Sequence, residues 1–203
     1  MLSFDNIQCA LDAHQPVLVP QDSRTHAAVA LIIRTSPSGQ EVLFIERAHH
    51  DGDPWSGDLG FPGGKVEKYD GEDRQTAERE TLEEIGLDLG GARYFGRLSD
   101  ITGVHFPVRV SCFVYGLAAP TTFRRGGEVR NIFWVPLENL LDPERHLKAP
   151  VHFAGRTLTS PAIRILEPGN APLWGITYRL VMQFLQILGS PQTAGALPLS
   201  PPL

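Results

Sequence analysis

The stretch Gly63–Leu87, GGKVEKYDGEDRQTAERETLEEIGL, decides the fold of this chain. It opens with a glycine pair, crosses an acidic loop and ends in a helical pattern that a glycine terminates. Ala77, Thr81 and Ile85 recur at every fourth position, which predicts a helix over about residues 74–86 with one apolar stripe. The helix packs this stripe against a core, and its other side can hold functional side chains.

Three carboxylates lie beside that stripe. Glu80 is three and four residues from Glu83 and Glu84, so all three project from about one turn of the helix. Most glutamate clusters on helices are solvated surface. Here the carboxylates flank the core stripe and repel one another unless a cation lies between them. Hard divalent ions such as Mg²⁺ bind carboxylates together with substrate phosphates, so the pattern indicates a metal-assisted reaction on a phosphorylated substrate.

The beginning of this helix has three candidate N-cap residues. Thr76, Asp70 and Asp73 are all side chains that cap helices, and the sequence does not choose among them. Arg79 has acidic residues on both sides and can hold the helix to the preceding loop.

The same stretch resembles the Nudix box, G-x5-E-x7-R-E-U-x-E-E-x-G-U, in which U is aliphatic. Residues 79–87, RETLEEIGL, match the second half except at Thr81, which is also β-branched. The spacing that begins at Gly64 is one residue longer than usual, and Glu72 falls out of register. This longer form, with Asp70 six residues after the second glycine, is similar to the coenzyme A pyrophosphatase branch.

The Nudix resemblance implies roles for the clustered residues. Glu80 and Glu84 are the first expected ligands of Mg²⁺ or Mn²⁺, Glu83 joins when a further ion binds, and the Gly63 carbonyl is an extra ligand. One of these carboxylates, or a water bound to it, accepts the proton of the attacking water. Arg79 is expected to form an ion pair with a carboxylate of the box.

Glu128 is a further candidate outside the box. It begins the segment EVRNIFWV after Gly126 and Gly127, and a glutamate in the corresponding loop of Nudix relatives often faces the metals and acts as base. The alternative is an ordinary glutamate at the edge of a strand.

The loop before the box predicts part of the substrate site. The chain keeps FIER at residues 44–47 and FPGG at residues 61–64, as in the coenzyme A branch, but has DGDPW where that branch is basic. We expect Arg47, Gly63 and Gly64 at the substrate. Trp55 either stacks on a base or packs within the protein. Arg109 either meets a phosphate or pairs on the surface.

Composition excludes several classes of protein. The chain has 203 residues, a net charge of −5 and 42% hydrophobic residues, which is ordinary for a globular domain. It has no dense basic patch for nucleic acid and no apolar run of membrane-spanning length. Its two cysteines are too few for a disulfide framework, and its first residues do not resemble a secretion signal. These features predict a cytoplasmic protein.

The remaining pattern predicts alternating strands and helices. Expected strands are residues 26–34, 41–47, 93–98, 109–117 and 129–135, with a hairpin within 152–165; expected helices are residues 1–13, 74–86, 137–141 and 174–188. This is an α/β chain, and the resemblance implies a Nudix-type α/β/α sandwich around a mixed sheet. The expected organisation is an N-terminal extension at 1–25, a Nudix hydrolase domain at 26–189 and a disordered tail at 190–203.

The function that the resemblance implies is metal-dependent hydrolysis of a diphosphate linkage in a nucleoside diphosphate derivative. Coenzyme A or an acyl-coenzyme A is the first expected substrate, and ADP-ribose, a dinucleotide or another conjugate is the second. A non-catalytic nucleotide-sensing Nudix-fold module is a third hypothesis, and the retained Glu80, Glu83 and Glu84 speak against it. A homodimer is a further expectation, with no nucleic acid or membrane partner.

Overall fold

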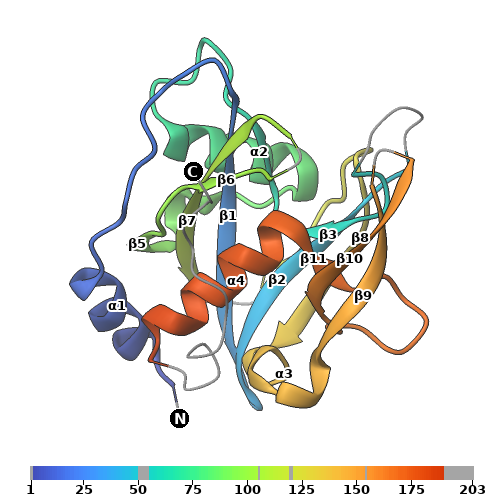
Figure 1. Ribbon diagram of the computed structural model, residues 1–203. Helices are drawn as coiled ribbons and strands as arrows, with labels where there is room; N and C mark the ends of the chain where they lie inside the picture. The colour runs from blue at the N-terminus through green and yellow to red at the C-terminus, as the bar shows by residue number, and fades with distance from the viewer. Residues whose placement is uncertain (1, 50–54, 105, 119–120, 154, 190–203) are drawn as a thin grey trace.

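The computed structural model describes residues 2–49, 55–104, 106–118, 121–153 and 155–189. A central sheet lies between helices on its two faces, with a small second sheet at one side (Figure 1). In Figure 1, α4 (Gly175–Ile187) crosses the front of the sheet beside α1 (Phe4–Ala13), and α2 (Asp73–Ile85) lies behind it.

The central sheet has eight strands within the described residues. Its middle strand, β1 (Thr25–Ser36), runs parallel to β7 (Val108–Leu117) and antiparallel to β2 (Gly39–Arg47), so the sheet is mixed. The other members are β3 (Leu59–Gly60) and β8 (Val129–Pro136) beside β2, β4 (Gly63–Lys65) beside β1, and β5 (Arg93–Arg97) and β6 (Ile101–Thr102) beside β7.

A second sheet contains β9 (His146–Phe153), β10 (Arg156–Ile163) and β11 (Leu173–Trp174) in antiparallel order. Its β9–β10 pair confirms the predicted hairpin, whose tip residue 154 lies outside the described residues. The sequence did not predict a separate sheet. Short helical segments complete the chain: α3 (Leu137–Leu141) and two 3₁₀ turns, Leu89–Gly91 and Pro143–Arg145.

Strand β1 divides the core because successive side chains of a strand point to opposite faces. Leu31 packs in a cluster with Ile7 of α1 and Phe184 of α4, whereas the next residue, Ile32, packs in a second cluster with Ile85 of α2. All five side chains are at most 1% exposed. The two clusters lie on opposite faces of the sheet, which confirms the predicted α/β/α sandwich.

The N-terminal segment is attached to the sheet at several points. Ile7 and Leu11 of α1 are buried, and the Val17 N–H donates to the Ser99 hydroxyl at 2.9 Å. The Asp100 N–H donates in turn to the Val17 carbonyl at 2.9 Å. The predicted division between residues 25 and 26 stays a prediction, as does the disordered tail at 190–203, which lies outside the described residues.

The predicted stripe of α2 is confirmed, since Ala77, Thr81 and Ile85 are completely buried. The N-cap is Glu72, which was not among the predicted caps. Its N–H donates to the Gln75 side chain at 3.2 Å.

The three predicted caps have other positions. Asp73 is the first residue of α2, and the Thr76 hydroxyl donates to the Asp70 carboxylate at 2.8 Å. Asp70 is thereby directed at the side of the helix, where it also meets an arginine. Of the helices in the described residues, none is long and apolar enough to cross a membrane.

Candidate active site

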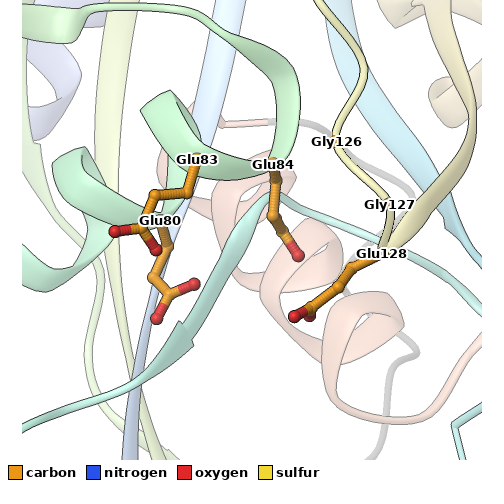
Figure 2. Close-up of a pocket in the computed structure, with 6 residues that line it drawn as sticks. All are labelled: Glu80, Glu83, Glu84, Gly126, Gly127 and Glu128. Atoms are coloured by element: carbon orange, nitrogen blue, oxygen red, sulfur yellow. The ribbon is translucent and has the colours of Figure 1, made fainter.

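One pocket collects the predicted carboxylates. It lies between the last turns of α2 and the loop that leads into β8, and Figure 2 shows the side chains that surround it. Its lining residues are Glu80, Glu83, Glu84, Gly126, Gly127 and Glu128. Glu84 reaches in from the helix and Glu128 from the loop on the other side, so residues 44 positions apart in sequence share one space.

Glu84 is the most buried of these carboxylates, with 4% of its surface exposed. One oxygen accepts the Gly63 N–H at 2.9 Å, and the other lies 3.9 Å from Nη1 of Arg47. Burial, together with the nearby charges of Glu80 and Glu128, raises the pKa of Glu84 to about 7, although the Gly63 N–H and Arg47 act in the opposite direction. The Gly63 N–H and Arg47 therefore hold the carboxylate in place but do not offset the cost of burying its negative charge.

Arg79 holds the acidic side of α2 to the preceding loop. Its guanidinium donates to both oxygens of Asp70 at 3.1 and 3.0 Å, to Glu80 at 2.8 Å and to Glu83 at 3.1 Å. The expected ion pair with a carboxylate of the box is present. Burial raises the pKa of Glu80 even though Arg79 opposes the shift, whereas Glu83 is 59% exposed.

The glycine pair brings a backbone strand against these side chains. Gly63 and Gly64 belong to β4 and pair with Val29 and Ala28 of β1. A Cβ atom on Gly64 would lie 2.4 Å from the carboxyl carbon of Glu80. A side chain at Gly64 would therefore displace the carboxylate of Glu80 from its present position.

Glu128 is positioned by the end of β2. The strand pairs Arg47 with Val129, and the next residue, Ala48, donates its N–H to the Glu128 carbonyl at 2.8 Å. The predicted residues Arg47 and Glu128 therefore lie near each other beside Glu84.

Trp55 and Arg109 have other neighbours. Trp55 contacts the rings of Phe106 and Phe153, with centroids at 5.0 and 6.1 Å. Arg109 donates to the Val19 carbonyl and to the His26 ring. Neither Trp55 nor Arg109 is among the described residues that line the pocket.

Two glycines at the pocket were not among the predicted site residues. Gly126 and Gly127 line the pocket, and the only signal was their position directly before Glu128. The contact of Trp55 with Phe106 and Phe153 was not predicted, because these residues lie far apart in sequence and meet only through the fold.

The donor set fits a hard divalent cation. It offers only oxygen ligands, and three of its four carboxylates come from about one turn of one helix. No three His, Cys, Asp or Glu side chains in the described ranges form a ready-made metal cluster, and Arg79 contacts two of the carboxylates. A cation would offset the repulsion that contributes to the raised pKa of Glu84.

We expect Asp70→Asn to lower the free energy of unfolding at pH 6 by about 2 kcal/mol, because the variant loses hydrogen bonds between charged groups. Arg79 is the main reason that the pKa of Asp70 is lowered in the folded protein. Its contribution is therefore present above about pH 4, the usual pKa of an unfolded Asp, and is lost as the pH falls. Urea unfolding at pH 6 and pH 3 checks this: the gap between parent and variant must narrow at pH 3, and a constant gap contradicts it.

Comparison with known proteins agrees with this geometry. The family model of the NUDIX domain matches residues 24–154. An uncharacterised Schizosaccharomyces pombe protein is 35% identical over 75% of this chain, which spans 57% of that protein's length. The human mitochondrial coenzyme A diphosphatase NUDT8 is 29% identical over 85% of this chain and 75% of its own. The crystal structure of a MutT/nudix family protein from Enterococcus faecalis superposes with a TM-score of 0.55 at 14% identity, over 93% of this chain and 75% of that one. On the match over residues 24–154, this chain belongs to the Nudix family.

Proposed function

We propose that this protein hydrolyses a diphosphate linkage in a nucleoside diphosphate derivative with the help of Mg²⁺ or Mn²⁺. The observation that carries the proposal is the pocket lined by Glu80, Glu83, Glu84 and Glu128, with Glu84 buried. Burial and the nearby charges of Glu80 and Glu128 raise the pKa of Glu84, and a bound cation would offset that cost.

The residues of the pocket have different proposed roles. Glu80 and Glu84 are the first ligands, the more exposed Glu83 joins for a further ion, and the Gly63 carbonyl completes the set. When bound, the ion neutralises the diphosphate and orients the leaving phosphate. Glu128, or one of the box carboxylates, accepts the proton of the water that attacks phosphorus.

Two structural features support this division. Glu84 is anchored by the Gly63 N–H, which fixes the direction of its second oxygen toward the pocket. Arg79 is bound to Asp70 as well as to the box carboxylates, which supports a role in holding the loop and helix together rather than in the reaction.

Coenzyme A or an acyl-coenzyme A is our first substrate, cleaved to a phosphopantetheine and adenosine 3′,5′-bisphosphate. Similarity to the human coenzyme A diphosphatase supports this choice at 29% identity. The loss of basic residues at 51–55 favours the alternatives, which are ADP-ribose, dinucleotides or other conjugates. The residues in question, apart from Trp55, lie outside the described part of the chain.

The substrate-binding residues are part of the same proposal. We propose Arg47 for a phosphate contact, and its guanidinium, 3.9 Å from the carboxylate of Glu84, supports that choice. Trp55 and the 40% exposed Phe106 form an aromatic surface on which a base can stack. For Arg109, a phosphate contact stays a prediction, and so do a cytoplasmic location and a homodimer.

A substrate panel tests the proposal. Coenzyme A, its 3′-dephospho form, ADP-ribose and a dinucleotide are incubated with Mg²⁺, Mn²⁺ or a chelator, and product masses are measured. We expect cleavage only with metal. Equal cleavage of coenzyme A and its dephospho form counts against recognition of the 3′-phosphate. Calorimetric binding of a nucleotide with no turnover of any substrate would instead support the sensing module.

A further inference from the structure

The loop before β8 is docked on the C-terminal end of α2. The last carbonyls of a helix have no partner within the helix and must find one elsewhere. Here the Arg124 N–H donates to the Ile85 carbonyl at 2.9 Å, and the Gly126 N–H donates to the Glu84 carbonyl at 2.7 Å. The loop thus completes the hydrogen bonding of the turn that carries the buried carboxylate.

This contact depends on glycine. A Cβ atom on Gly126 would lie 2.7 Å from the Glu83 carbonyl oxygen and 3.2 Å from that of Glu84. On the helix side, a Cβ atom on Gly86 would lie 2.9 Å from the Cβ atom of Arg124. The two backbones approach this closely because neither position carries a side chain.

Glu128 lies two residues beyond the contact, and its backbone is fixed on both sides. The Val129 N–H donates to the Gly126 carbonyl at 3.4 Å, and the Ala48 N–H donates to the Glu128 carbonyl at 2.8 Å. In Figure 2 the chain passes from Gly126 through Gly127 to Glu128, whose side chain turns into the pocket. The approach of Gly126 to α2 and the bond from β2 together set where Glu128 lies relative to Glu84.

We propose that Gly126 is a positioning residue for diphosphate hydrolysis, which acts by holding Glu128 opposite Glu84. The inference rests on the proposed function of the pocket. Gly126 itself contributes no reacting group. The substitution Gly126→Ala adds a methyl group that must move the loop away from the helix. A displacement of about 1 Å at a catalytic group can cost on the order of 10²-fold in rate.

The test is a double-mutant cycle of Gly126→Ala and Glu128→Gln, with Gly91→Ala as control. Gly91 has nothing within 4 Å of an added Cβ atom and lies in the 3₁₀ turn after α2. We expect G126A to lower kcat about 10- to 100-fold, with KM within about threefold. In the E128Q background the same substitution should change kcat less than about twofold, because the group that it displaces is already lost. G91A should match the parent.

Mn²⁺ affinity, measured by electron paramagnetic resonance, gives a readout that does not need turnover. We expect Mn²⁺ affinity to stay close to that of the parent in G126A, E128Q and the double variant, because Glu128 is not among the proposed metal ligands. A G126A variant that binds Mn²⁺ more weakly acts on the metal ligands instead and overturns the inference. Effects of the two substitutions on kcat that multiply in the double variant overturn the inference. So does a G126A or an E128Q variant with the kcat of the parent. If the parent cleaves no substrate, the proposed function fails and this inference fails with it. If the parent cleaves a substrate but the effects of the two substitutions on kcat multiply, only the inference fails.

Arg124→Pro provides a second variant should G126A not fold. It removes the N–H that the Ile85 carbonyl accepts, and so it weakens the contact between the loop and α2 at a different residue. The same cycle with E128Q then applies, with the same expected loss of effect in the double variant.

Discussion

Glu84→Gln should lower kcat about 10³-fold, which corresponds to ~4 kcal/mol of lost transition-state stabilisation. Glutamine keeps the size of the side chain and can still accept the Gly63 N–H, so the loss reports the missing charge. Steady-state rates with Mg²⁺ and with Mn²⁺ on the best substrate measure the effect. Glu78→Gln is the matched control: it lies on the same helix but contacts Arg74 and Tyr115, away from the pocket, and should stay within about twofold.

The stability of the same variant separates lost chemistry from lost fold. Burial raises the pKa of Glu84 to about 7, which is above the value of about 4.3 for an unfolded Glu. The folded protein therefore loses stability as the pH rises between these values, because the unfolded side chain gives up its proton while the buried one keeps it. At pH 8 without metal, E84Q should unfold at or above the parent's melting temperature. An E84Q protein that turns over every substrate as fast as the parent contradicts the metal site.

The helix and its carboxylates could be predicted because their signal is local. Residues 79–87 carry a helical period, a terminating glycine and three acids on one side, and none of these needs a distant partner to be recognised. The same holds for β1, whose apolar run at residues 26–34 predicted a buried strand. The structure confirms both elements to within two residues at each end.

The missed features are those that depend on contacts between distant segments. Strands β3 and β11 have two residues each, too few to show a period, and they exist because longer neighbours pair with them. Gly126 lies against two carbonyl oxygens of α2, and no spacing in the sequence reveals this contact. The N-cap was misassigned because Arg79 and Thr76 draw Asp70 away from the helix end.

Gly63→Ala should be the most destabilising single substitution at the site. Gly63 has φ of +149°, where side chains are strained, and an added Cβ atom would lie 2.3 Å from the Ala28 carbonyl oxygen and 2.5 Å from Cα of Val29. Backbone strain and overpacking together cost about 3 kcal/mol or more, which lowers the melting temperature by about 6–12 °C in a chain of this size. Because β4 must move, the N–H that anchors Glu84 moves with it, so kcat should also fall.

Gly39→Ala separates the two causes. Gly39 has φ of +131°, yet nothing lies within 4 Å of an added Cβ atom, so this variant carries the backbone strain without the collision. It should lose about 1–2 kcal/mol and keep the parent's kcat. Thermal unfolding of both variants and rates measured well below their transitions decide the matter. If G63A unfolds at the same temperature as G39A and keeps its activity, β4 is free to move without disturbing Glu84, and the anchoring of that carboxylate by the Gly63 N–H is not what holds the site together.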